Sequence, residues 1–302
     1  MALFRKHLEE VHSSIKLIDI EERFDIYFSR FFGLYFAKIG KYYYLTPTQV
    51  SLASLFVGVV GGALLFHQNE RLFIGTGCFL IVLAGVLDSA DGQLARMTGQ
   101  SSDLGRYIDG VIDNFVFIAI YIGGSLYFFE VYGWWILALA FASAYTISLK
   151  AALYEFYKTE YLQLVGKSTS GHIPLSADDL ETVGDKWYHK VIHAIAKDYT
   201  GKQLRYTTRT VEWRRKALEF SKDEQKQEAF DVTYRMLNKP LLTWWALFCG
   251  TNTHRTAIIV FSLMARFDLY LWASTIWTIA LIPLTISQKV KDRKLLEAFE
   301  KS

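Results

Sequence analysis

Apolar stretches that alternate with charged segments are the main feature of this chain. Six of them cover residues 47–66, 72–87, 111–129, 134–153, 256–267 and 269–286. A helix needs about 20 apolar residues to cross a bilayer, and the first stretch reaches this length without a charge. The last two stretches are short or closely spaced. The pattern predicts an all-α integral membrane protein with about six transmembrane helices.

The N-terminal part of the chain has a different pattern. Between residues 24 and 39, aromatic side chains recur at helical spacing, with Arg30 and Lys38 among them. A basic, aromatic helix is typical of a segment that lies in the membrane interface. We therefore predict an N-terminal interfacial amphipathic helix ahead of the first transmembrane helix.

The first transmembrane helix has a well-marked start. Thr46 can serve as its N-cap, and Pro47 suits the first helical position, where its missing N–H has no helical partner. Further along, Gly58 and Gly62 stand four residues apart. Small residues at this spacing allow a second helix to approach closely.

Residues 158–239 are rich in charges of both signs, which predicts a hydrophilic helical insert. A basic stretch within it favours a solvated helix face, with binding to anionic lipid headgroups as the alternative. The stretch contains Arg205, Arg209, Arg214, Arg215 and Lys216, with Tyr206 and Trp213 between them.

The predicted division of the chain follows from these segments. The N-terminal segment covers residues 1–43, and four transmembrane helices follow in 44–157. The insert covers 158–239, two further transmembrane helices lie in 240–287, and a charged tail covers 288–302.

The distribution of basic residues predicts the orientation. Nearly all Lys and Arg lie in the terminal segments, the insert and residues 96–106, whereas the opposite loops hold little beyond Arg71 and Arg266. The positive-inside rule therefore places both termini, the insert and residues 96–106 at the cytoplasmic face. Whether the membrane is a bacterial cell membrane or a eukaryotic endomembrane stays open. The net charge of +3 indicates no nucleic-acid partner.

One pair of aspartates follows the end of the second apolar stretch, and a second pair lies at the start of the third. Asp88 and Asp91 are three residues apart, and Asp109 and Asp113 are four apart, so each pair shares one helix face. A single aspartate at a helix end is usually a solvated cap. Four carboxylates brought together by a short linker would repel one another unless a cation neutralised them. An all-oxygen site of this kind suits Mg²⁺ or Mn²⁺, and two such ions can clamp a pyrophosphate.

Other residues near the aspartates suit a phosphate ligand. Gly92 and Gly105 leave room for a nucleotide or phosphate to approach the backbone. Arg96 can neutralise a phosphate through two parallel hydrogen bonds. A carboxylate that is not needed for metal binding could take a proton from an incoming hydroxyl.

The full pattern is Asp-x2-Asp-Gly-x2-Ala-Arg-x8-Gly-x3-Asp-x3-Asp, which resembles the signature of the CDP-alcohol phosphotransferase family. The resemblance implies a metal site formed by Asp88, Asp91, Asp109 and Asp113. It also implies that Asp113 acts as the catalytic base. The CDP pocket that it implies is formed by Asp88, Gly92, Ala95, Arg96 and Gly105. Members of this family are commonly homodimers, so a homodimer is expected.

The resemblance implies transfer of a substituted phosphate group from a CDP-activated donor to an alcohol, with release of CMP. We favour CDP-diacylglycerol as donor and inositol phosphate, glycerol phosphate or serine as acceptor. The reason is that Lys150, Arg255 and the basic insert would suit an anionic acceptor. The alternative direction is transfer from CDP-choline or CDP-ethanolamine to diacylglycerol.

Two functions outside this class remain as hypotheses. Carboxylates within a membrane can line the path of a cation transporter. The aspartates lie at one edge of the predicted spans, which disfavours this function. A metal-dependent hydrolase of CDP-lipids would use the same residues, with water as the acceptor.

Overall fold

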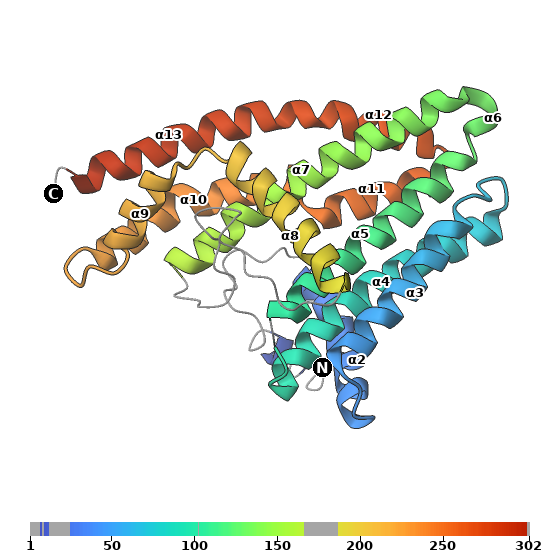
Figure 1. Ribbon diagram of the computed structural model, residues 1–302, viewed down its shortest axis with the longest axis horizontal. Coiled ribbons are helices and arrows are strands. Elements are labelled where there is room, and N and C mark those ends of the chain that lie inside the picture. Colours follow the sequence, from blue (N-terminus) through green and yellow to red (C-terminus); the bar gives the residue numbers. More distant parts are fainter. Residues whose placement is uncertain (1–6, 8, 12–24, 102, 166–186, 301–302) are drawn as a thin grey trace. The chain divides into compact units, whose positions relative to one another are not determined.

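The computed structural model describes residues 7, 9–11, 25–101, 103–165 and 187–300. Within these residues, the side chains of 103–104, 106–109, 187–188 and 192 lie outside the description. Every described element is a helix, which confirms the all-α prediction (Figure 1).

The elements in chain order are η2 (Asp25–Ser29), α2 (Arg30–Tyr42), α3 (Pro47–Leu64), α4 (Arg71–Thr98), α5 (Asp103–Leu126), α6 (Phe129–Tyr132), α7 (Trp134–Leu164), α8 (Trp187–Tyr206), α9 (Val211–Phe220), α10 (Gln227–Cys249), α11 (Thr251–Leu263), α12 (Phe267–Ile276), η4 (Trp277–Ala280) and α13 (Leu281–Glu300). They form two compact units. Among the described residues, the first unit contains 7, 9–11, 25–101, 103–146 and 254–276, and the second contains 147–165, 187–253 and 277–300.

Among the described residues, four helical segments are long and apolar enough to cross a membrane, namely Pro47–Leu64, Arg71–Thr98, Trp134–Leu164 and Phe267–Glu300. This finding supports an integral membrane protein. The apolar part of α5, Gly110–Leu126, is shorter, and α11 has 13 residues. A total of six spans therefore stays a prediction.

Glycines allow α3 to pack closely against both α4 and α5. A Cβ atom added to Gly62 would lie 2.6 Å from the backbone nitrogen of Ile120, and one added to Gly58 would lie 2.7 Å from Val116. Gly61, on another face of α3, approaches the carbonyl oxygen of Gly77. The close helix neighbour predicted from Gly58 and Gly62 is thus confirmed, and it is α5.

The predicted start of α3 is also confirmed. The Thr46 hydroxyl accepts a hydrogen bond from the Gln49 backbone N–H at 3.3 Å. The Gln49 side-chain oxygen accepts one from the Thr46 N–H at 2.8 Å. This reciprocal capping box, with Pro47 at the first helical position, satisfies donors that a helix N-terminus leaves without partners.

Helix α2 packs one face on α4 and exposes aromatic side chains on the other. A Cβ added to Gly33 would lie 3.2 Å from the backbone of Ala90. Phe32, Tyr35 and Phe36 are exposed. This pattern is compatible with a helix in the membrane interface, and that location stays a prediction.

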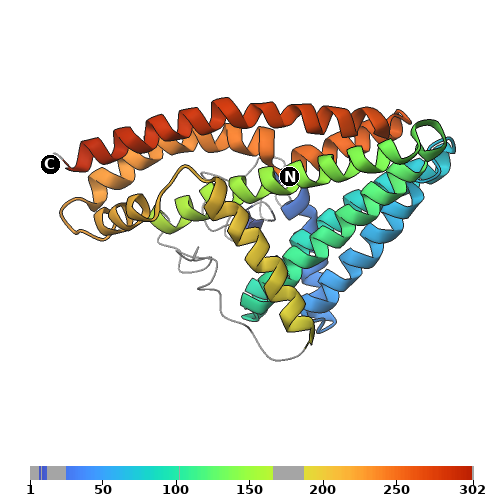
Figure 2. The same ribbon diagram turned by 45° about the horizontal axis from the view of Figure 1, so that its top comes forward.

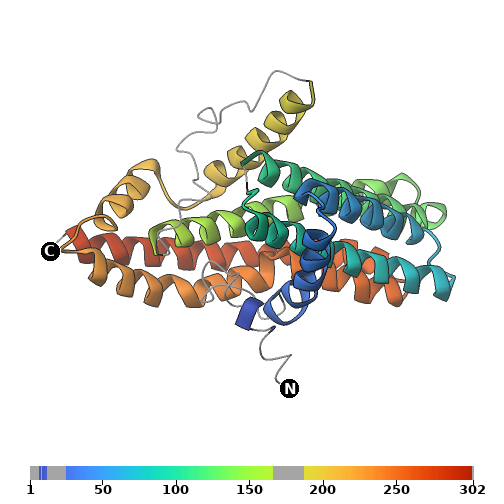
Figure 3. The same ribbon diagram turned by 90° about the horizontal axis from the view of Figure 1, so that it is seen from below.

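The second unit is built around α7, α10 and α13, and the red α13 runs beside the orange α10 (Figures 2 and 3). The predicted boundaries at 157/158 and 239/240 fall inside α7 and α10, which continue through them. Residues predicted as an insert therefore belong to helices that also carry apolar sequence.

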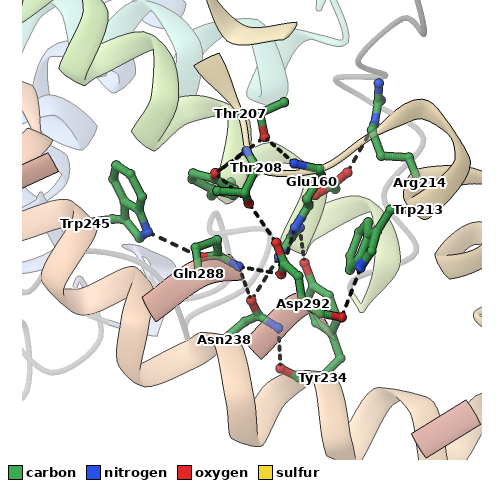
Figure 4. A network of polar contacts seen from close by, with 12 residues as sticks. Glu160, Thr207, Thr208, Trp213, Arg214, Tyr234, Asn238, Trp245, Gln288 and Asp292 are labelled. Atoms are coloured by element: carbon green, nitrogen blue, oxygen red, sulfur yellow. Dashed lines mark hydrogen bonds and ion pairs between the residues drawn. The ribbon is translucent and has the colours of Figure 1, made fainter. Parts of the chain in front are cut away.

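A buried ionic network lies in this unit (Figure 4). Arg209 forms an ion pair with Glu160 and lies 3.1 Å from Asp292. It also donates hydrogen bonds to Tyr234 at 2.8 Å and to Asn238 at 2.9 Å. Burial alone would lower the pKa of Arg209, but the charges of Asp292 and Glu160 outweigh that effect and raise the pKa well above its ordinary value.

The prediction of a solvated face for the basic stretch is wrong for two of its residues. Arg209 and Arg214 are 4% and 3% exposed, respectively, and Arg214 donates a hydrogen bond to Glu160 at 3.1 Å. Buried charges require partners. The partners come from α7 and α13, far away in the sequence, and no local pattern reveals them.

Candidate active site

Helix α4 carries the first aspartate pair. It continues without a break from Arg71 to Thr98, so Asp88 and Asp91 lie one helical turn apart. Asp91 is only 5% exposed, and its carboxylate accepts a hydrogen bond from the Ser51 hydroxyl of α3. Ser51 is a site residue that the sequence did not indicate.

A left-handed glycine ends α4 close to the aspartates. Gly99 has a φ of 68°, a conformation that costs glycine little. Its N–H and that of Gln100 both donate to the carbonyl oxygen of Ala95. Helix α5 begins at Asp103, only a few residues after α4 ends at Thr98. This short connection is the linker that the sequence predicted between the two aspartate pairs.

Helix α5 carries Asp109 and Asp113. The Asp113 carboxylate lies 3.7 Å from the guanidinium of Arg255 on α11. It is also near enough to Asp91 to interact with it electrostatically. A shared metal site for the two aspartate pairs stays a prediction. The side chain of Asp109 lies outside the described residues.

Gly85 has no side chain, and the Arg255 guanidinium occupies the space beside it. A Cβ atom added to Gly85 would lie 2.2 Å from a terminal nitrogen of the Arg255 guanidinium. Gly85 precedes Asp88 by three residues on α4 and therefore shares its helix face. Gly85 was not among the predicted site residues. Its spacing from Asp88 indicated that the two residues share a helix face. Its contact with Arg255 could not be predicted, because that residue lies far away in the sequence.

The remaining residues of the predicted CDP pocket lie on the same two helices. Arg96 is exposed, and its guanidinium lies over Gly92, 3.5 Å from where a Cβ would be. Ala95 is half-buried on α4, and Gly105 lies in the first turn of α5. A role for these residues in binding CDP stays a prediction.

Lys150, predicted to contact the acceptor, belongs to the second unit. It is 1% exposed on α7 and lies within electrostatic range of Cys249 on α10. A contact between Lys150 and the acceptor stays a prediction.

The chemistry of the donor atoms fits Mg²⁺ or Mn²⁺, because the aspartates of the motif offer carboxylate oxygens. Among the described side chains, no group of three or more His, Cys, Asp and Glu is arranged to hold a metal ion. Asp109, one of the four predicted ligands, is not among these side chains. The metal site stays a prediction.

Comparisons with known proteins support the family resemblance that the aspartate motif indicated. Residues 44–174 match the family model described as CDP-alcohol phosphatidyltransferase. The phosphatidylinositol phosphate synthase of Streptomyces avermitilis is 33% identical over 28% of this chain and 33% of its own length. A CDP-diacylglycerol–serine O-phosphatidyltransferase of Helicobacter pylori is 29% identical over 34% of this chain and 42% of its own length.

A bifunctional IPC transferase and DIPP synthase of Rubrobacter xylanophilus is 37% identical over 27% of this chain and 18% of its own length. In each of these three relatives the match covers less than half of the relative's length. No solved structure matches the chain significantly. The segment that matches the CDP-alcohol phosphatidyltransferase family model, residues 44–174, contains the complete aspartate motif.

Proposed function

We propose that this chain is a phospholipid-synthesising transferase. It would move the phosphatidyl group of CDP-diacylglycerol to the hydroxyl of a polar alcohol and release CMP. The observation that carries the proposal is the ion pair between Asp113 on α5 and Arg255 on α11, which packs against Gly85 of the aspartate-bearing α4. The family whose model matches residues 44–174 handles CDP-alcohols.

In this reaction, the acceptor oxygen attacks the phosphorus of the phosphatidyl group, and the bond from that phosphorus to the CMP oxygen breaks. Asp113 would take the proton of the attacking hydroxyl. Arg96 would neutralise a phosphate of the donor. Bound Mg²⁺ or Mn²⁺, held by Asp88, Asp91, Asp109 and Asp113, would supply positive charge to the pyrophosphate.

Arg255 supports an anionic acceptor such as inositol phosphate or glycerol phosphate. Its guanidinium lies 3.7 Å from the Asp113 carboxylate. A phosphate bound by Arg255 would therefore hold the acceptor hydroxyl close to the proposed base. One relative is named a phosphatidylinositol phosphate synthase, and another is named for transfer to serine. We therefore rank phosphorylated alcohols first and serine second.

The test is CMP release by the purified protein in nanodiscs with Mg²⁺ or Mn²⁺. CDP-diacylglycerol is offered with each polar alcohol in turn, and CDP-choline or CDP-ethanolamine with diacylglycerol. We expect release that depends on one phosphorylated alcohol and is lost in Asp113→Asn. The matched control is Asp198→Asn, because Asp198 is exposed on α8 in the second unit.

Other outcomes would point to other functions. CMP release only from CDP-choline or CDP-ethanolamine with diacylglycerol would support diacylglycerol as the acceptor. Formation of phosphatidate without a new lipid would support a hydrolase. Metal flux through liposomes without CMP release would support a cation transporter.

A homodimer, and a site at the cytoplasmic face, belong to the same proposal. They are tested by the mass of the purified particle and by labelling of single cysteines from either side.

A further inference from the structure

The second unit contains a groove between α9 and α13, with a volume of about 310 Å³. Lys216 of α9 and Lys289 and Arg293 of α13 line it. Lys289 and Arg293 are four residues apart, so they lie one helical turn from each other on the same face of α13. Three basic side chains therefore border one small cavity.

Acidic side chains offset part of this charge. Lys216 pairs with Glu212 at 3.3 Å and with Glu300 at 2.7 Å, and Arg293 lies 3.5 Å from Glu297. These three carboxylates are exposed, and exposed ion pairs are weak.

The remaining acidic residue, Asp292, is turned toward the interior, where it accepts hydrogen bonds from Arg209 and Thr208. In the part of the chain that the structure describes, Lys289 has no ion pair within the groove or elsewhere. Lys289 is therefore the basic side chain of the groove that is most available to an anionic ligand.

The base of the groove is held in place before any ligand binds. The Trp213 indole N–H donates to the carbonyl oxygen of Asp292 at 3.1 Å, which ties α9 to α13. Thr208 donates to the Asp292 carboxylate at 2.8 Å. A preorganised site loses less entropy when it binds a ligand.

The groove lies where the apolar surface of α13 ends. Exposed apolar side chains form a stripe through Ile279, Ile282, Ile286 and Val290, and all are at least 41% exposed. The segment Phe267–Glu300 is long and apolar enough to cross a membrane, so we expect this stripe to face lipid. Lys289 and Arg293 flank its last member, where basic side chains would meet the lipid headgroups.

We propose that this groove binds the phosphate of an anionic phospholipid, whose acyl chains lie along the stripe. Lys289 and Arg293 would contact the phosphate, and Lys216 would add charge from α9. Basic pockets at the polar end of transmembrane helices recognise anionic headgroups through these contacts. The site lies in the second unit, outside the aspartate motif, and does not depend on the proposed transferase activity.

The test measures binding of dioctanoyl phosphatidylglycerol, dioctanoyl phosphatidylcholine and inorganic phosphate to the full-length protein in detergent. The variant Lys289→Gln/Arg293→Gln is compared with Lys291→Gln/Lys294→Gln, which removes the same charge from α13 outside the groove. Both are also made with Asp91→Asn, so that binding at the aspartate motif is weakened equally.

We expect phosphatidylglycerol to bind at least about 10-fold more tightly than phosphatidylcholine. The groove variant should lose roughly 10- to 30-fold in affinity, while the control pair changes less than about threefold. Equal loss in both pairs, or equal affinity for the two lipids, would overturn the proposal. Inorganic phosphate that binds as tightly as phosphatidylglycerol would also overturn it in favour of a free-anion site. Unchanged thermal unfolding of the groove variant shows that it still folds.

Discussion

The hydroxyl of Ser51 on α3 donates a hydrogen bond to the buried carboxylate of Asp91 on α4. This contact joins the first transmembrane helix to the aspartate motif and holds one predicted metal ligand in a single orientation. Groups that orient a metal ligand from behind usually matter almost as much as the ligand itself.

Replacing Ser51 by Ala should therefore lower the rate of CMP release by about 10-fold and raise the Mg²⁺ or Mn²⁺ concentration needed for half-maximal rate. The control is Ser54→Ala, because Ser54 lies one turn further along α3 and donates instead to the carbonyl oxygen of Ala84. If both variants keep the metal dependence of the wild type, Ser51 does not position Asp91 for metal binding.

Gly85→Ala should impair acceptor binding, because the new methyl group would occupy the position of the Arg255 guanidinium. We expect the KM for a phosphorylated acceptor to rise by roughly 10-fold or more, with a smaller effect on the KM for the CDP donor. Gly75→Ala on the same helix is the matched control, since nothing lies within 4 Å of its added Cβ. An unchanged acceptor KM in Gly85→Ala would argue against Arg255 as the acceptor contact.

Gly62→Ala should destabilise the packing of α3 on α5. Its Cβ would lie 2.6 Å from the backbone of Ile120, and overpacking of this kind costs about 1–3 kcal/mol. Thermal unfolding in detergent should therefore begin at a lower temperature. Gly110→Ala on α5 has open space around its Cβ and should leave unfolding unchanged. Equal unfolding temperatures for Gly62→Ala and the wild type would contradict the close α3–α5 contact.

Arg209→Met should be strongly destabilising, because it leaves the buried carboxylates of Glu160 and Asp292 without their shared cation. Removing one member of a buried ionic network typically costs about 3–5 kcal/mol. Arg205→Met, an equal change at an exposed position, should cost less than about 0.5 kcal/mol. Thermal unfolding of the two variants measures the difference. Similar stability would show that the network contributes little.

Local patterns were sufficient for several features of the fold. Thr46, Pro47 and Gln49 are neighbours in the sequence, so their capping box follows from residue type alone. Gly58 and Gly62 share a helix face by their spacing, which indicated a close neighbour, although only the structure identifies that neighbour as α5.

Longer-range features were not predictable in the same way. The basic stretch suggested a solvated face, yet Arg209 and Arg214 are buried against Glu160, which lies some 50 positions earlier. A charge pattern does not reveal whether ion-pair partners on other helices will offset the free-energy cost of burying a charged side chain. The same limitation hid the role of Gly85, whose significance depends on a side chain of α11.

The sequence by itself determined the helical class, the apolar segments and the aspartate motif with its family, because periodicity, composition and residue spacing act within short stretches of chain. Only the tertiary structure decided that Ser51 supports Asp91, that Gly85 makes room for Arg255 beside Asp113, and that two arginines of the predicted insert are buried in ion pairs. These contacts depend on which helices pack together. That packing is determined by the fit of many side chains across the fold, and no single segment contains it.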